Sequence, residues 1–162
     1  MSGRVEAIWI KRSFGGVMDA AVEASLVAGK GIERDASFGR AHRQVTVIEK
    51  EIFDRIRRTL PAAEPAMRRA NIMVSGVRLA QSRNHVLTVG GVRLLLRGET
   101  RPCERMDEQC PGLRDALAVG WGGGAHAVVL DDGLVRVGDD AELSAPEPPP
   151  EPRSRGARHR PG

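Results

Sequence analysis

The stretch Val86–Arg97, Val-Leu-Thr-Val-Gly-Gly-Val-Arg-Leu-Leu-Leu-Arg, carries the clearest structural pattern in this chain of 162 residues. Two short apolar runs flank Gly90-Gly91, and glycine pairs between such runs are typical of a tight hairpin turn. Further short apolar runs, separated by glycine-containing turns, lie on both sides of this stretch. The repeated pattern indicates a mainly β protein.

Other segments extend this pattern along the chain. We expect strands at residues 5–10, 45–48 and 72–74, and a second hairpin at residues 126–137. A short helix is expected at residues 111–117, with proline in its first turn. Many short strands with helical insertions favour a closed or partly closed β-barrel over a doubly wound sheet.

One longer helix is predicted directly after the strand at 45–48. Ile48, Ile52, Ile56 and Leu60 recur every four residues and form one apolar stripe, and Pro61 ends the pattern. This stripe indicates a helix that packs its apolar side on the core and leaves its charged side in solvent.

Composition divides the chain into two parts. Residues 1–143 have the apolar and charged content of a soluble domain, whereas residues 144–162 are rich in Pro and Arg and are expected to form a disordered tail. No apolar run approaches the about 20 residues that cross a bilayer. The N-terminus lacks a signal-peptide pattern. A cytoplasmic protein without membrane contact is therefore expected.

The formal charge of +4 is spread unevenly. The last nineteen residues carry four Arg and two Glu, so the preceding part, with 21 basic and 19 acidic groups, is nearly balanced. A basic surface for nucleic acid is not indicated, and any nucleic-acid contact is expected to be weak and through the tail. The absence of tyrosine and the five Phe and Trp residues argue against base-stacking platforms.

Two cysteines, Cys103 and Cys110, are too few for a disulfide framework. Cys103 lies in Arg101-Pro102-Cys103-Glu104-Arg105, where flanking guanidinium groups would lower the thiol pKa and favour the reactive thiolate. Glu104 would act in the opposite direction. The residues alone leave two interpretations open: an activated thiol on a stiff turn, or a small buried hydrophobic residue.

Three polar or glycine-rich stretches also have two interpretations. Arg68-Arg69 before the strand at 72–74 could clamp an anion or be solvated at the strand entry. The Gly29-Lys30-Gly31 turn could bring backbone N–H groups to an anion or be a plain turn. The glycine-rich run at 120–124 could permit a close backbone approach or be a flexible loop.

Several of these pieces, in this order, resemble a MOSC domain, the module named for the C-terminal part of molybdenum-cofactor sulfurases. The resemblance covers most of residues 5–143. The matching motifs are Gly29-Lys30-Gly31-Ile32-Glu33-Arg34-Asp35, Arg43-Gln44-Val45-Thr46-Val47-Ile48, Arg69-Ala70-Asn71-Ile72, Pro102-Cys103-Glu104-Arg105-Met106 and the glycine-aspartate hairpin at 133–139.

The resemblance implies a β-barrel and a function linked to the molybdenum cofactor. Cys103 matches the family cysteine, proposed as a persulfide-bearing sulfur carrier or as a molybdenum ligand. The cofactor-binding positions implied by the motifs are Arg69, Asn71, Arg105, Arg43, Lys30 and Asp35. As a ligand, Cys103 would serve a reductase of N-hydroxylated compounds. A partner protein would have to donate the sulfur or the electrons.

The sequence also departs from the family pattern. Arg34 and Ala36 replace the glycine before the family aspartate and the basic residue after it, which puts the role of Asp35 in question. Cys110 has no counterpart and is expected to be buried or incidental rather than a resolving thiol. Two alternatives to molybdenum-cofactor chemistry are therefore kept: a non-catalytic barrel that binds anions or nucleic acid, and a family member that has lost its activity.

Overall fold

The structure is a computed structural model that describes residues 3–14, 16–102 and 105–146. Cys103, Glu104 and residues 147–162 lie outside the described residues, so most of the expected tail does too. The side chain of Arg105 is likewise not described. No helix in the described part of the chain is long and apolar enough to cross a membrane.

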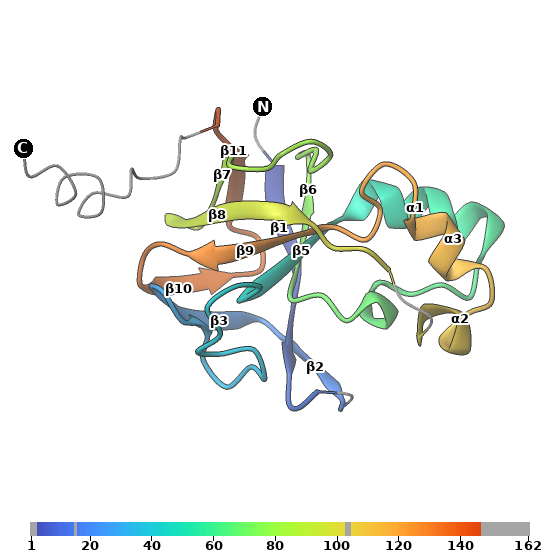
Figure 1. The fold of residues 1–162 in the computed structure, drawn as a ribbon, viewed down its shortest axis with the longest axis horizontal. Helices are drawn as coiled ribbons and strands as arrows, with labels where there is room; N and C mark the ends of the chain where they lie inside the picture. Colours follow the sequence, from blue (N-terminus) through green and yellow to red (C-terminus); the bar gives the residue numbers. More distant parts are fainter. Residues whose placement is uncertain (1–2, 15, 103–104, 147–162) are drawn as a thin grey trace, which may run out of the picture.

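A closed barrel of seven strands forms the centre of the molecule (Figure 1). Its strands are β1 (Gly3–Lys11), β5 (Val45–Glu49), β6 (Ile72–Ser75), β7 (Val86–Val89), β8 (Val92–Glu99), β9 (Ala125–Val129) and β11 (Asp140–Leu143). They follow the order β11-β7-β8-β9-β5-β6-β1, and pairing of β1 with β11 closes the circle. The sequence prediction of a mainly β barrel is confirmed.

The strand directions follow from the connections. Among the described strand pairs of the barrel, β5 and β6 alone run parallel, and the crossover between them contains α1 (Lys50–Thr59) and the short η1 (Pro65–Arg68). A helical crossover is the usual way to join two parallel strands. The added strand β2 (Met18–Ala21) pairs with the far end of β1.

A small second sheet lies against the barrel. It has the order β10-β3-β4, from β10 (Gly133–Arg136), β3 (Glu23–Val27) and β4 (Gly31–Ile32). Leu26, Ile32 and Val135 from this sheet are almost fully buried in the same apolar cluster as the barrel interior. The two sheets therefore share one core.

The helices gather on one side of the barrel (Figure 1). Besides α1, they are α2 (Arg105–Gln109) and α3 (Leu113–Leu117). A second apolar cluster joins Ile52, Phe53 and Ile56 of α1 to the outward-facing Ile48 and to Leu113 and Leu117 of α3. The predicted apolar stripe is therefore core packing, and the expected short helix at 111–117 is confirmed by α3.

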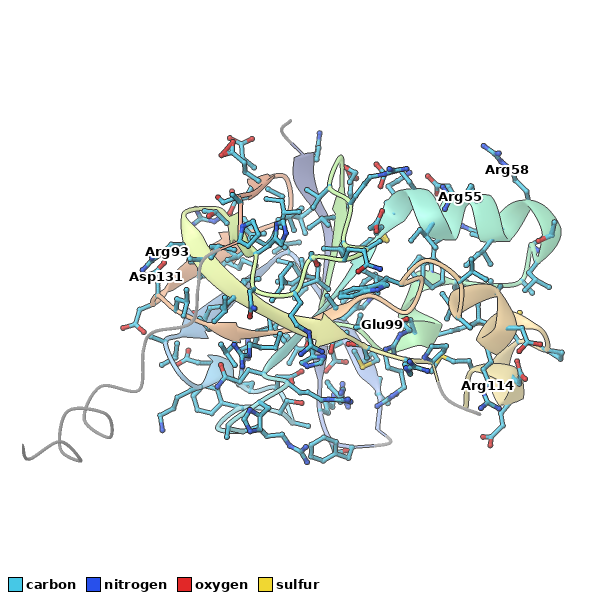
Figure 2. All side chains as sticks on the ribbon, turned by 45° about the horizontal axis from the view of Figure 1, so that its top comes forward. Arg55, Arg58, Arg93, Glu99, Arg114 and Asp131 are labelled. Carbon is cyan, nitrogen blue, oxygen red and sulfur yellow. The ribbon has the colours of Figure 1, made fainter. Side chains whose placement is uncertain are left out.

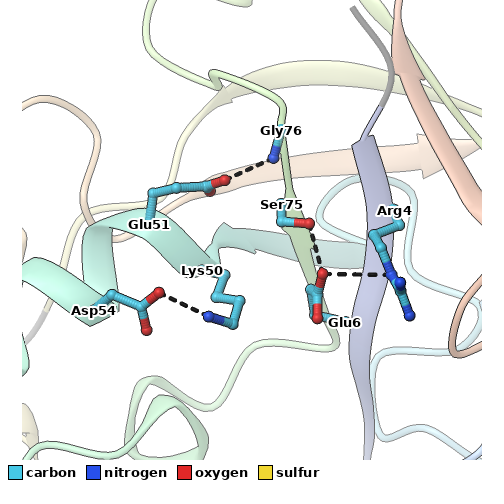
Figure 3. Close-up of polar contacts among 7 residues, drawn as sticks. All are labelled: Arg4, Glu6, Lys50, Glu51, Asp54, Ser75 and Gly76. Atoms are coloured by element: carbon cyan, nitrogen blue, oxygen red, sulfur yellow. Dashed lines mark hydrogen bonds and ion pairs between the residues drawn. The ribbon is translucent and has the colours of Figure 1, made fainter.

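Polar contacts fasten the start of α1 to the end of β6, and β6 to β1 (Figure 3). Glu51 accepts a hydrogen bond from the Gly76 N–H at 2.7 Å, just after β6. The Ser75 hydroxyl donates to Glu6 of β1 at 2.6 Å. Because these groups are polar and near the surface, they fix the orientation of the elements more than they add stability.

The predicted hairpin at 126–137 is wrong. β9 pairs with β5 and β8, whereas β10 pairs with β3 in the other sheet. Side chains of the intervening turn direct the chain from the barrel to the second sheet. Asp131 accepts the N–H of Arg93 in β8 at 2.9 Å, and Asp132 accepts the N–H of Ala28, just after β3, at 2.8 Å. Figure 2 shows the Arg93 and Asp131 side chains together beside β8.

The glycine-aspartate hairpin at 133–139 is also not a two-strand unit. β10 ends at Arg136, and the following strand, β11, pairs with β7 and β1 instead. An Asp-Gly turn marks a change of direction, but it does not determine which strand becomes the partner. Long-range pairing decided both cases.

Candidate functional site

A cavity of about 310 Å³ lies where the ends of β1, β5 and β8 meet the segment before α2. Its lining residues are Lys11, Phe14, Ser37, Arg40, Arg43, Thr46, Arg68, Arg69, Thr100, Arg101 and Met106. Six of them carry positive charge, and none of the described lining residues carries a carboxylate. An anionic ligand would compensate this charge.

Asp35 and Asn71 lie beneath the cavity and hold its backbone. Asp35 accepts hydrogen bonds from the Lys11 N–H at 2.7 Å and from the Ser37 N–H at 2.9 Å. The Asn71 amide donates to Asp35 at 2.9 Å, and its oxygen accepts the Thr46 N–H at 3.1 Å. Lys11, Ser37 and Thr46 all line the cavity, so the buried Asp35–Asn71 pair shapes it from below.

The two neighbouring arginines before β6 both reach the cavity. Arg69 has left-handed backbone geometry (φ 64°), and its guanidinium donates to the Gly16 carbonyl at 2.6 Å. Arg68 is buried and donates to the Gly123 carbonyl at 2.7 Å. Both guanidinium groups therefore bind backbone carbonyls at the cavity, and the interpretation of the pair as an anion clamp stays a prediction.

The glycine-rich run at 120–124 allows a close backbone approach next to the cavity. A Cβ atom on Gly122 would lie 2.6 Å from the Leu117 carbonyl oxygen, and one on Gly123 would overlap the Thr100 carbonyl. A larger residue would therefore push the run away from its neighbours. The close-approach interpretation of this run is confirmed.

The cavity lowers the basicity of one of its own cations. Burial lowers the pKa of Lys11 below its ordinary value, and the guanidinium groups of Arg69, Arg68 and Arg40 act in the same direction, whereas Asp35 opposes them. The Phe14 ring lies near two of these charges, 5.6 Å from Lys11 Nζ and 4.6 Å from Arg40 Cζ. A ring face attracts cations without neutralising them.

Thr100 contributes a buried hydroxyl at the end of the strand before the cysteine turn. The residue is 8% exposed, and its Oγ1 atom has no hydrogen-bond partner in the described part of the chain. Buried polar groups without partners are uncommon in native proteins and call for an explanation. A bound anion could accept a hydrogen bond from this hydroxyl after rotation about one side-chain bond.

The structure brings together only some of the residues predicted from sequence. Arg43 and Arg69 line the cavity, and Asn71 and Asp35 support it. Lys30 is exposed in the turn between β3 and β4 and is not among the described lining residues. Cys103 and the side chain of Arg105 lie outside the description.

Sequence reasoning missed several contributors to the cavity, among them Lys11, Arg40 and Thr100. Each is an ordinary polar residue at a strand end or in a loop, with no local motif around it. They meet only because barrel closure brings distant segments together. Cys110, in contrast, is buried among the helices as expected.

Comparison with known proteins decides the family. The model of the MOSC domain matches residues 33–142, more than half of the chain. The chain belongs to the MOSC domain family. MOSC domains are associated with molybdenum-cofactor enzymes. No curated protein sequence matches this chain significantly.

Solved structures share the MOSC fold of this chain. The YuaD protein from Bacillus subtilis has a TM-score of 0.78 at 23% identity, covering 91% of this chain and 98% of that one. YiiM from Escherichia coli has a TM-score of 0.65 at 16% identity, covering 90% and 72%. YiiM from Geobacillus stearothermophilus has a TM-score of 0.67 at 15% identity, covering 88% and 75%.

Proposed function

We propose that the cationic cavity binds the anionic molybdenum cofactor and that Cys103 supplies a thiolate at its edge. The observation that carries this proposal is the lining of the cavity, which contains six cationic side chains. Arg101, one of the six, and the apolar Met106 both line the cavity and lie on either side of Cys103 in the sequence. Two peptide units span at most about 7 Å, so covalent connectivity alone keeps Cys103 close to Arg101.

The described residues fit the anionic part of such a cofactor. Arginine side chains bind phosphate through paired N–H donors, and Arg40, Arg43 and Arg101 all line the cavity. The described residues contain no group of three or more His, Cys, Asp or Glu that could hold a metal ion. Bound here, the cofactor would supply a molybdenum centre that already carries its own organic ligand.

The positive charge of the cavity lining suits either role proposed for the Cys103 sulfur. Positive groups stabilise a thiolate, which is both the nucleophile and the metal-binding form of cysteine. As a sulfur carrier, the thiolate attacks the outer sulfur of a donor protein's persulfide. The new S–S bond forms as the donor's S–S bond breaks, and the donor thiolate leaves with the electron pair, so no outside oxidant is needed.

As a molybdenum ligand, Cys103 would instead fix the metal centre at the edge of the cavity. Soft thiolates suit such a metal. The protein would then reduce N-hydroxylated compounds with electrons from a partner protein, while Arg43 and Arg69 hold the anionic end of the cofactor.

Anaerobic purification, followed by assays for molybdopterin, molybdenum and persulfide, tests this proposal. Retained molybdopterin and molybdenum would support the ligand role, whereas a Cys103 persulfide without cofactor would support the carrier role. Cys103→Ser should abolish the persulfide or the metal, and Cys110→Ala should change neither. If Cys103→Ser left both at the wild-type level, the proposal would fail.

A second candidate is a binding module without thiol chemistry. The cationic cavity favours it, because Lys11, Arg40 and Arg43 could hold an anion without Cys103. In that case Cys103 would react with iodoacetamide at neutral pH no faster than in the denatured chain. Binding of RNA that depends strongly on salt and is lost on removing residues 144–162 would point to the tail instead.

A further inference from the structure

A second cavity of about 400 Å³ adjoins the first on the outside of the barrel. It is lined by Arg40, Ala41, His42, Arg43 and His126. Arg40 and Arg43 line both cavities, so the loop that carries them separates the two spaces. None of the described lining residues of the second cavity comes from the sequence segment 100–106.

His126 forms the barrel side of this cavity. It lies on β9, where Ala125 and Ala127 face the core and His126 between them is only half-buried. It pairs in register with Gly98 of β8. A Cβ atom on Gly98 would lie 3.1 Å from Arg83 Nη2 and 3.3 Å from His126 Cε1, so the guanidinium and the imidazole meet over this glycine.

The charged groups around His126 are positive. Burial lowers the pKa of His126, and Arg43, Arg83 and Arg97 lower it further, whereas the Glu99 backbone opposes them. The Glu99 side chain lines a different cavity, with Arg101 and Arg114. Figure 2 shows Glu99 at the end of β8 and Arg114 on α3.

These arginines also lack the ion pairs that surface arginines often have. None of the five ion pairs among the described residues includes Arg40, Arg43, Arg83 or Arg97. The Nδ1 atom of His126 is buried and has no hydrogen-bond partner in the described part of the chain. Within the part of the chain that the structure describes, Arg40, Arg43, His42 and His126 line this cavity, Arg83 and Arg97 act on His126, and no carboxylate is paired with any of the four guanidinium groups.

We propose that the cavity between the Arg40–Arg43 loop and His126 is a second anion site, which binds a phosphate-class oxyanion. Guanidinium groups donate paired hydrogen bonds to tetrahedral oxyanions, and Arg83 and Arg43 approach His126 from two different segments. A bound oxyanion relieves the repulsion among these cations and favours the protonated imidazole. This site goes beyond the proposed function, because it requires neither Cys103 nor the molybdenum cofactor.

Histidine NMR provides the direct test, because the chain has only four histidines and each signal can be assigned by substitution. Sulfate is the probe, since it keeps both negative charges from about pH 5 to about pH 8, the range in which histidine titrates. Sulfate is expected to raise the pKa of His126 in a saturable manner. Sodium chloride at matched ionic strength should not reproduce this increase.

Matched variants show whether the response belongs to the cavity. His126→Gln should remove the responding signal, and Arg43→Ala or Arg83→Ala should weaken sulfate binding about tenfold, which is typical of one charged hydrogen bond. Arg58→Ala, an equal loss of charge on α1, should leave binding unchanged. Equal shifts of all the histidines, or the same shift in chloride, would show general screening and overturn the proposal.

Larger probes identify the kind of ligand. Adenosine diphosphate should shift the same His126 signal if the site takes phosphate groups of small molecules. A short single-stranded oligonucleotide that bound more tightly than adenosine diphosphate, through the same arginines, would overturn the assignment to small ligands. Sulfate binding in Cys103→Ser separates this site from the proposed function, because the variant should bind sulfate at His126 as the wild type does.

Discussion

The buried hydroxyl of Thr100 has no hydrogen-bond partner among the described residues, and we infer that it binds an anion in the first cavity. We predict that Thr100→Val leaves stability unchanged or raises it by up to about 1 kcal/mol, because a buried hydroxyl without a partner is replaced by an apolar group. The same change should weaken anion binding in the first cavity by about three- to tenfold. Thr100→Ser should retain the binding.

The affinity of the first cavity for an anion can be measured through the alkylation of Cys103, which follows Thr100 closely in the sequence. Phosphate in the first cavity should protect Cys103 from iodoacetamide, so the phosphate concentration that halves the alkylation rate reports binding there. Urea unfolding of the ligand-free protein gives the stability. A loss of stability in Thr100→Val with unchanged protection would contradict the assigned role.

At the scale of single residues, the sequence indicated which motif residues belong to the site better than it indicated which other residues would lie beside them. The motif around Asn71 and Arg69 was identifiable because its residues are consecutive. Lys11 and Thr100 carry no such signal, since each becomes part of the cavity only when its strand ends there. The paired arginines left two interpretations open, and burial of Arg68 could not be read from the letters alone.

At the scale of elements, the loop after β6 is held by one carboxyl group, that of Glu49 at the end of β5. Glu49 accepts a hydrogen bond from the Leu79 N–H at 3.0 Å, and burial raises its pKa above the ordinary value of 4.5. Nearby Glu51 adds to this increase, whereas the Leu79 hydrogen bond and Arg78 oppose it. Because the folded state holds its proton more tightly than the unfolded chain, this group's contribution to stability falls as pH rises from about 4.5 through the folded pKa.

Glu49→Gln should remove that pH dependence, since an amide keeps the acceptor oxygen but cannot ionise. We expect the melting temperature of the variant, relative to wild type, to increase as pH rises from about 4 to about 7. Thermal unfolding across this range is the measurement, with the exposed Glu64→Gln as control. A difference between variant and wild type that does not change with pH would contradict the prediction.

Elements themselves were more predictable than their partners. The alternating run at β5 and the four-residue period of α1 are local signals, and both elements formed where expected. The chain after Asp131 was assigned to a hairpin because its turn residues suit one. Its true course depends on Arg93 and Ala28, which lie far away in the sequence, so no local pattern could reveal it.

For the whole molecule, β11 is the strand that closes the barrel. Ala141 pairs with Gly3 of β1 on one side and with Val89 of β7 on the other, and its side chain is fully buried. Truncation after Pro146 should shift the melting temperature by less than about 2 °C. Truncation after Asp139, which removes β11, should abolish cooperative unfolding.

Circular dichroism and thermal melts of the two truncated proteins test this contrast. A cooperative transition in the shorter protein, near the wild-type temperature, would show that closure by β11 is dispensable. Ser144 still donates its N–H to the Val86 carbonyl at 2.8 Å, so the longer protein retains this contact.

Closure by the final strand also sets an order of events during synthesis on the ribosome. Until residues 140–143 leave the exit tunnel, β1 and β7 each keep backbone groups that β11 will later pair. Such open edges can pair with other chains, and contacts between distant parts of a sequence form slowly. The nascent protein is therefore most vulnerable to aggregation just before β11 emerges, and chaperone protection matters most at that moment.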